Sequence, residues 1–414
     1  MFVYVNHEKE EKKIFHKNKA SKCCYFDCNK TSIYSHIISK SISINEISEN
    51  GHILKFLPQR NGDIKVPHFD LAGIQLNPAF NGFCIEHDGL FKPIDDNEIN
   101  NFYGVYLQLF RSISSHIYFS KIGKSMFPDI DLKKAEELVI NKVVSTSEKL
   151  GKPMDENKIN KLVATLNEEF KQINLKKNYK LENESNRLEK FKEYFYKKIN
   201  SIERSLIEAK FHKDKLFTLE IEDKEIPSQI FVYHTNFKIP VAVNAIHIFN
   251  HIPQNNFNFF IVVPYSDSSL IIGLIDSKLE NKLLNRTLDK INSTFNKNNN
   301  SISILNFVES IVISSSDYSY FTPSVINEMK KEKYDFFAND CMFLNEFQKA
   351  ETYLDDYDVS IFSELRQNLT NSIKIIDLQS TTSLPNRGSY DERYNKMKAK
   401  IDNENPILIS NSEN

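Results

Sequence analysis

Glycine is scarce in this chain, and its scarcity argues against the common nucleotide-binding loops. Only 10 of the 414 residues are glycine, about a third of the usual share of roughly 7%. No G-x-G-x-x-G motif occurs, which disfavours a Rossmann dinucleotide site. The Gly123-Lys124-Ser125 triplet matches the end of a P-loop, but Tyr118 stands where that motif needs its first glycine. We interpret the triplet as a turn.

Long apolar runs and an excess of charge of one sign are missing as well. No run of about 18 apolar residues occurs, so the sequence predicts no membrane-spanning helix. The first residues become charged before a signal-peptide core can form, which indicates a cytoplasmic protein. Lysine and arginine total 53 against 55 aspartate and glutamate, a net charge of −2. No chain-wide basic field therefore attracts nucleic acid, and any contact with DNA or RNA has to be local.

The hydrophobic pattern changes along the chain and predicts an α+β protein of four segments. Short apolar runs between Gly, Asn, Pro and Asp fill residues 1–97, as in small strands with tight turns. Helical spacing follows over 98–215, and runs typical of strands follow over 216–368. Residues 369–414 are polar, and we expect a mostly disordered tail.

Within these segments the apolar spacing predicts individual elements. A helix is expected after residue 98, a second from Asp131 to about Gly151, and an antiparallel helical hairpin over 155–215 that breaks at 174–186. Strands are expected at 229–236, 239–249, 258–265, 269–276 and 302–308, with one helix at 279–295.

Four of the five cysteines lie within the first 84 residues and are spaced as metal ligands. Cys23 or Cys24 pairs with Cys28 across a short turn, and Cys84 pairs with His87 as C-x2-H. Two such pairs supply the four corners of a tetrahedral zinc site. Ligation contributes on the order of 10 kcal/mol to a small domain that lacks a sufficient core. The sequence therefore predicts a structural zinc site, whereas Cys341, flanked by apolar residues, is expected to be an inert core residue.

This N-terminal segment resembles the HNH or treble-clef zinc fingers. It also resembles a group of uncharacterised bacterial proteins that share a C-x4-C, Ser-His and F-x-G-F-C-x2-H-D pattern. The similarity covers roughly residues 20–95, favours Cys23 over Cys24 as the ligand, and carries a phage-defence context. The matching residues are Cys23, Cys28, Ser35, His36, Phe80, Gly82, Phe83, Cys84, His87 and Asp88.

The resemblance implies a metal-dependent endonuclease. In HNH nucleases a hairpin histidine activates water, while neighbouring side chains hold a divalent cation such as Mg²⁺ on the scissile phosphate. His36 stands at the position of that base, and Asp88, which follows His87, is the carboxylate that the resemblance offers for the cation. Ser35 replaces the usual metal-binding residue before the base, and His87 replaces the last cysteine. Either Asn77 or Asn81 can occupy the position of the asparagine in the middle of the HNH motif.

A non-catalytic interpretation stands beside this one. His36 can instead be an alternative zinc ligand or a hydrogen-bond partner of a ligand, and zinc can staple a module that docks a protein partner. His52 and His68 are further candidate ligands. The pairs Asp95-Asp96 and Asp355-Asp356 are interpreted as solvated charges.

Overall fold

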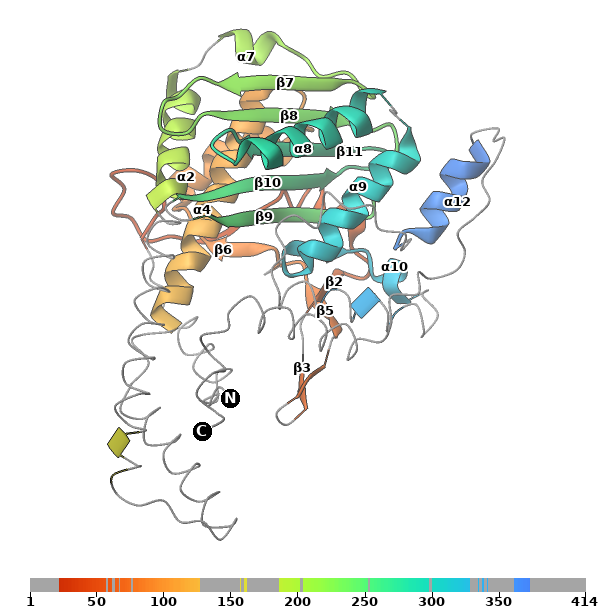
Figure 1. Cartoon of the computed structure of the whole chain (residues 1–414), viewed down its shortest axis with the longest axis horizontal. Helices are drawn as coiled ribbons and strands as arrows, with labels where there is room; N and C mark the ends of the chain where they lie inside the picture. Colours follow the sequence, from red (N-terminus) through yellow and green to blue (C-terminus); the bar gives the residue numbers. More distant parts are fainter. Residues whose placement is uncertain are drawn as a thin grey trace.

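The fold is α+β and is built around one antiparallel sheet of eight strands (Figure 1). The computed structural model describes residues 22–126, 186–327 and 361–372, with short gaps at 57–58, 62–63, 67, 76, 202–203, 252–253 and 298–299, and a few single positions elsewhere. Along the sheet the strands follow the order β5-β2-β12-β9-β10-β11-β8-β7. Their bounds are β2 (His52–Phe56), β5 (Phe69–Gly73), β7 (Leu216–Ile221), β8 (Ser228–His234), β9 (Val241–His251), β10 (Gln254–Pro264), β11 (Ser269–Asp276) and β12 (Ser319–Phe321).

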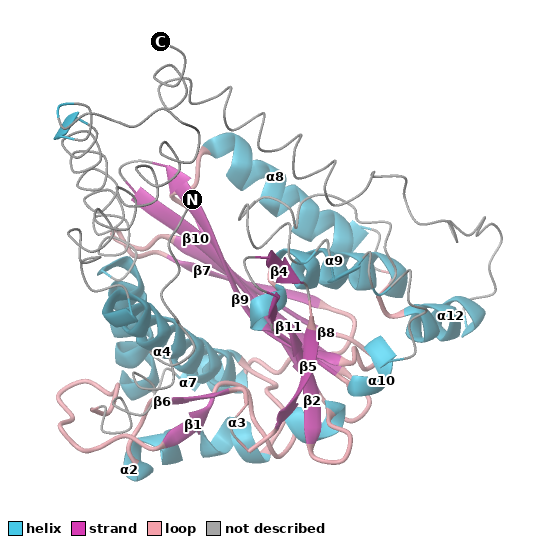
Figure 2. Ribbon diagram, turned by 90° about the horizontal axis from the view of Figure 1, so that it is seen from below, coloured by secondary structure: helices cyan, strands magenta, loops and turns pink. Residues whose placement is uncertain are grey.

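In the described part of the chain, two short antiparallel pairs of strands lie outside this sheet, and helices cover both of its faces (Figure 2). One small pair joins β1 (Tyr34–His36) to β6 (Ala79–Asn81), and the other joins β3 (Gln59–Asn61) to β4 (Ile64–Val66). In Figure 2, α4 and α7 lie on one side of the sheet and α8 and α9 on the other. The helices are α2 (Ile85–Asp88), α3 (Lys92–Asp96), α4 (Phe102–Met126), α7 (Arg204–Glu208), α8 (Asn281–Asn292), α9 (Ser301–Ser314), α10 (Pro323–Asn327) and α12 (Ser363–Ser372). Residues 186–201 are also helical.

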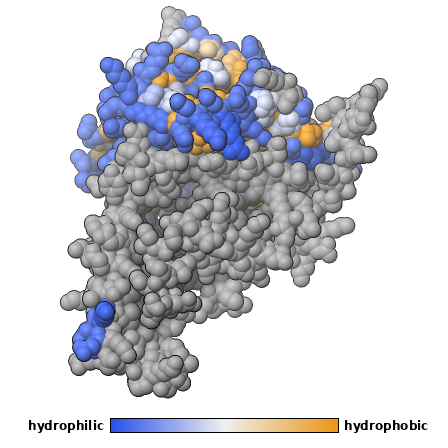
Figure 3. Space-filling view, viewed as in Figure 1, coloured by the Kyte–Doolittle hydropathy of each residue, from blue (hydrophilic) through white to orange (hydrophobic). Residues whose placement is uncertain are grey.

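The central strands consist mainly of long apolar runs because both of their faces are buried. On β10, Phe257, Phe259 and Ile261 belong to the core that includes α4, while Phe260 and Val262 belong to the core that includes α9. Successive strand residues point to opposite faces, so a strand covered on both sides needs apolar residues at every position. Helix α8 covers the sheet with one face only, and its exposed positions give the hydrophilic surface seen in Figure 3.

The sheet combines strands from distant parts of the sequence. Strands β2 and β5 come from residues 1–97, and the remaining six come from residues 216–368. The joint is β12, which pairs with β2 on one side, with Phe321 opposite Leu54, and with β9 on the other. The sheet therefore crosses the predicted boundaries at residues 97 and 215.

Several predicted elements are present as expected. In α4, the apolar residues with helical spacing are buried, namely Phe102, Tyr106, Leu109, Phe110, Ile113 and Ile117. In the helix at 186–201, which lies in the second half of the predicted hairpin, Leu188, Phe191, Phe195 and Ile199 are buried with the same spacing. Strands β8 to β11 and helix α8 overlap their predicted ranges. Within the described residues, none of the helices combines the length and the apolar composition needed to cross a bilayer.

Some predictions fall on residues that the structure does not describe. These are the helix from Asp131 to Gly151, almost all of the first helix of the hairpin, and the pair Asp355-Asp356. The predicted tail begins at residue 369, so its first residues belong to α12, which ends at Ser372. Residues 373–414 lie outside the described residues.

The strand predicted at 302–308 is wrong, because these residues open helix α9. The side chain of Asn300 accepts a hydrogen bond from the backbone N–H of Ser303, which caps the helix. Helix α9 is buried along most of its length, so its sequence lacks the polar face that normally reveals helical spacing. A short apolar run cannot distinguish a buried strand from a buried helix.

Helix α9 also buries a carboxylate that anchors the segment before α12. Glu309 is fully buried and accepts hydrogen bonds from the backbone N–H groups of Ile361 and Phe362, at 2.9 and 3.1 Å. Arg366 of α12 completes this contact at 2.5 Å. Burial raises the pKa of Glu309 to about 7, although these partners act in the opposite direction.

Two buried histidines are expected to make the fold sensitive to acid. Burial lowers the pKa of His116 to about 4 and that of His247 to about 3. The unfolded chain, with an ordinary histidine pKa of about 6.5, binds these protons first as the pH falls. Each histidine should therefore remove about 2 kcal/mol from the free energy of unfolding between pH 7 and pH 5.

Urea titrations at both pH values test this expectation, with His247→Gln as the comparison. Glu309 opposes the effect, because a raised carboxyl pKa stabilises the fold as the pH falls. Wild type is therefore compared with His247→Gln. The free energy of unfolding should fall less in the variant than in wild type between pH 7 and pH 5, by about 2 kcal/mol. An equal loss in both proteins would contradict the prediction.

Candidate metal centre

Cys23 and Cys28 lie on a tight turn that the backbone closes. Lys22 and Thr31 form a bridge, and the N–H of Cys23 donates to the carbonyl of Lys30 at 2.9 Å. Between the cysteines, Asp27 has a φ of +57°, a conformation that aspartate tolerates better than most residues. The reversal of the chain thus brings the two thiols to the same side.

Cys84 and His87 come from the start of helix α2. Cys84 directly precedes the helix and His87 is its third residue, so one helical turn places both side chains on one side. The backbone joins this segment to the cysteine turn, because the N–H of Cys24 donates to the carbonyl of Gly82 at 2.6 Å. A side chain at position 82 would collide with the ring of Phe80, at 2.4 Å from its nearest atom. Glycine is therefore required for the close packing beside Cys84.

The four side chains meet with the spacing of a tetrahedral zinc site. All four ligand atoms lie within 4.8 Å of one another. The Nδ1 atom of His87 lies 3.4 Å from the sulfur of Cys84 and 3.5 Å from that of Cys23, and the sulfurs of Cys28 and Cys84 are 3.9 Å apart. Ordinary Zn–S and Zn–N bond lengths give tetrahedron edges of about 3.8 Å between sulfurs and about 3.6 Å between sulfur and nitrogen. The group can hold zinc with little movement.

Neighbouring aromatic rings fix the histidine of this Cys3His group. The ring of Tyr25 stacks on His87 with 3.8 Å between centroids and 14° between planes. The hydroxyl of Tyr25 donates to Asn200 at 3.2 Å, and its ring contacts Tyr196 at 5.0 Å. The helix at 186–201 thereby holds the cysteine turn in place.

Cys24 lies outside the Cys3His group, as the resemblance implies. Its thiol is largely buried near Lys192, Lys121 and Glu189, and burial raises its pKa. Cys341 is also buried, in agreement with a core role. The candidate ligand His52 is exposed on β2 and does not belong to the group. His68 does not belong to it either.

The thiols of the Cys3His group differ in acidity. Burial raises the pKa of the Cys23 thiol to about 12. Burial also acts to raise the pKa of the Cys84 thiol. The hydrogen bonds from the backbone N–H of His87 and from the neighbouring thiols outweigh this effect, so that its pKa falls below the ordinary value. Of these two thiols, Cys84 therefore loses its proton first. Because zinc binds thiolates, zinc uptake has to release the proton of Cys23.

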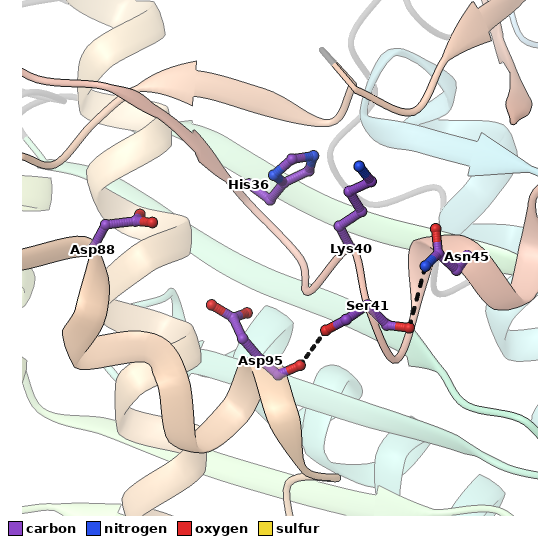
Figure 4. Close-up of a pocket in the computed structure, with 6 residues that line it drawn as sticks. All are labelled: His36, Lys40, Ser41, Asn45, Asp88 and Asp95. Carbon is purple, nitrogen blue, oxygen red and sulfur yellow. Dashed lines mark hydrogen bonds between the residues drawn. The ribbon is translucent and has the colours of Figure 1, made fainter. Parts of the chain in front are cut away.

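A pocket of about 380 Å³ opens beside the Cys3His group (Figure 4). Helix α2 contributes Asp88, the residue after His87, and β1 contributes His36 at its end. In Figure 4 the side chains of Asp88, His36 and Asp95 face the same space. The structure thus places both predicted catalytic residues in one pocket. Its lining consists of His36, Lys40, Ser41, Asn45, Asp88 and Asp95.

The imidazole of His36 is held in a defined tautomer. Its Nε2 lies 3.1 Å from the carbonyl oxygen of Ile74, which can only accept, so Nε2 carries the proton. Burial lowers the pKa of His36, which keeps the ring neutral at neutral pH. Nδ1 is therefore the nitrogen that can accept a proton.

Ser35 has a supporting role that its place in the sequence did not reveal. The residue is fully buried between the strand and helix α2. Its hydroxyl accepts a hydrogen bond from the N–H of Phe83 at 3.2 Å and bonds to the carboxyl of Asp88. Burial raises the pKa of Asp88, and the bond to Ser35 opposes this shift. Ser35 thus orients Asp88.

The sequence interpretation of Asp95 as a solvated charge is wrong. Its carboxylate lines the pocket and accepts a hydrogen bond from Arg111 of α4 at 2.7 Å. The sequence held one indication that a charged group is buried nearby, because Arg111 is the only Asp, Glu, Lys or Arg between residues 99 and 120. Of the two candidate asparagines, Asn81 contacts Tyr118 and Asn77 contacts the backbone of Gly73. Asn45 lines the pocket instead.

Metal-binding geometry in the described part of the chain is confined to the Cys3His group. Among those residues it is the one set of three or more Cys, His, Asp or Glu side chains close enough to hold an ion. Comparison of the chain with protein-family models, with curated proteins and with solved structures found no match. The chain therefore presents a site that can bind zinc beside a polar pocket.

Proposed function

We propose that this chain is a cytoplasmic zinc protein that hydrolyses phosphodiester bonds of nucleic acid. The observation that carries the proposal is the shared pocket of His36 and Asp88, built against a group that can hold zinc. Zinc would act as a structural staple, since all four corners of its site come from the protein. The resemblance to HNH fingers and to bacterial phage-defence proteins supports the same activity.

His36 would act as the general base. Its Nδ1 accepts a proton from water while the water oxygen attacks phosphorus, and the bond from phosphorus to the leaving sugar oxygen breaks. The leaving oxygen then takes a proton from solvent. The hydrogen bond to the carbonyl of Ile74 keeps the opposite nitrogen protonated throughout.

Asp88 and Asp95 are the carboxylates that would hold a divalent cation in this pocket. Bound there, Mg²⁺ would stabilise the negative charge that develops on the phosphate. These carboxylates and His36 do not form a complete metal site by themselves, so oxygen atoms of the nucleic acid would have to complete the coordination. Lys40 is the basic side chain of the lining and can contact a phosphate.

A cleavage assay tests this function. The zinc-loaded chain is incubated with linear, supercoiled and single-stranded DNA and with RNA, in the presence of Mg²⁺, Mn²⁺ or Ni²⁺. Cleavage that needs one of these ions in addition to zinc supports the proposal. No cleavage of any substrate with any ion would reject it.

A non-catalytic docking module is the second candidate, and an exposed apolar residue favours it. Ile85 directly follows Cys84 and is 78% exposed. Zinc bound by Cys84 would hold this apolar side chain rigidly at the surface, where a protein partner can bury it. Binding of a partner that Ile85→Ser abolishes, without any nuclease activity, would favour this function.

A further inference from the structure

Helix α4 buries a charged side chain directly beneath the pocket. Arg111 has only 2% of its side chain exposed, and its Nη1 lies 2.7 Å from the carboxylate of Asp95, which is 32% exposed. The guanidinium also lies over the ring of Phe91, 5.0 Å from its centroid. Burying a cation is costly unless a partner compensates it. Here the partner is a carboxylate that faces the pocket.

The same guanidinium reaches the segment that carries His36. Its Nη2 donates to the side-chain oxygen of Gln108 at 3.0 Å, and the Nε2 of Gln108 donates to the carbonyl of Ile37 at 2.9 Å. Ile37 directly follows His36 in the sequence. One side chain of α4 is therefore linked to both walls of the pocket.

The two walls are also joined to each other. The backbone carbonyl of Asp95 accepts hydrogen bonds from the hydroxyls of Ser39, at 3.1 Å, and of Ser41. The loop after His36 and the helix that carries Asp95 are thus joined twice, by the serine hydroxyls on the carbonyl of Asp95 and through Arg111. A rigid connection of this kind holds reacting groups at a constant separation.

We propose that Arg111 is a positioning residue, which sets the carboxylate of Asp95 directly and the imidazole of His36 through Gln108. An incoming phosphodiester then meets base and carboxylate at a fixed separation. The phosphodiester part of this inference rests on the proposed function, whereas the link between Arg111 and His36 does not.

The cost of this arrangement argues against a purely stabilising role. The Nε of Arg111 is buried without a hydrogen-bond partner among the described residues. Well-packed apolar residues often replace a buried ion pair with no loss of stability. Charges around His36 act in both directions, since Arg111 and Lys40 lower its pKa while Asp95 raises it, and Asp88 is a further nearby carboxyl group.

Three variants of the full-length, zinc-loaded chain test the proposal. Arg111→Lys keeps the charge, Arg111→Met removes it, and Asp95→Asn removes its partner. The ring of His36 is titrated by NMR after histidine labelling, with its signal assigned through His36→Gln. Zinc content and melting temperature are measured in parallel, and kcat and KM are measured if the wild type cleaves nucleic acid.

We expect opposite shifts in the His36 titration. Its midpoint should rise by about 0.5 pH unit in Arg111→Met and fall in Asp95→Asn, while Arg111→Lys stays near wild type. In an active protein, kcat should fall about 10-fold in Arg111→Met with little change in KM, and Arg111→Lys should recover most of it.

Other outcomes would overturn the inference. If Arg111→Met keeps the wild-type midpoint of His36, Arg111 does not act on the base, whatever happens to the melting temperature. If Arg111→Met fails to fold, Asp95→Asn still decides, because a wild-type midpoint there would show that the ion pair of Asp95 and Arg111 does not act on His36. The titration is read without catalysis, so an inactive wild type rejects the proposed function and leaves this test intact.

Discussion

Replacing Cys84 with serine is expected to abolish zinc binding and to unfold much more than the N-terminal turn. Structural zinc contributes on the order of 10 kcal/mol in small domains. Cys84 and Cys23 belong to the same continuous core as α4 and the face of the sheet that α4 covers. A large fall in melting temperature, by 10 °C or more, is the expected scale when several kcal/mol are lost from a protein of this size.

Elemental analysis and thermal unfolding measure this prediction together. Wild type should carry about one zinc per chain, and Cys84→Ser and Cys28→Ser should carry little or none. Cys24→Ser is the matched control, because Cys24 adjoins a ligand but lies outside the Cys3His group. It should keep both the zinc and the melting temperature. Unchanged zinc in Cys84→Ser would show that the Cys3His group does not bind the metal.

His36→Ala is expected to lose phosphodiester cleavage by about 100-fold or more, the usual scale for removing a general base. Zinc content should not change, because His36 is not part of the Cys3His group. The melting temperature should fall only slightly, since one partly buried hydrogen bond to Ile74 is lost at a net cost of about 1 kcal/mol.

Glutamine at position 36 separates catalysis from structure. Its amide N–H can still donate to the carbonyl of Ile74, but it cannot accept a proton from water. His36→Gln should therefore be as inactive as His36→Ala and more stable. If His36→Gln retains activity, His36 has a structural role. In wild type, cleavage should rise with pH and level off near neutrality, because burial lowers the pKa of His36 below its ordinary value of about 6.5.

The parts of the fold that the sequence predicted are those with local signals. The strands from β8 to β11 consist of long apolar runs bounded by turn residues, and α4 shows a regular helical stripe. The pairing of β12 with β2 had no such signal, because two short strands far apart in the chain carry no information about each other. Only the packing of the complete core selects that partner.

The candidate site shows the same division. Spacing predicted Cys28, Cys84 and His87 of the metal-binding group, since Cys84 and His87 lie one helical turn apart and Cys28 follows a short turn. The choice of Cys23 over Cys24 came from the resemblance. For Asp95 the sequence offered only the isolated charge of Arg111, and that these two residues are partners follows from the placement of their two helices. Polar contacts between elements become visible only when the elements are placed.

The late arrival of β12 has a consequence for synthesis on the ribosome. About 265 residues separate the end of β2 from the end of β12, and translation adds roughly 5–20 residues per second. For roughly 13–50 s, one edge of β2 is therefore without its final neighbour. An open strand edge readily pairs with other chains, so this interval is when the nascent protein is most exposed to aggregation and most dependent on chaperones.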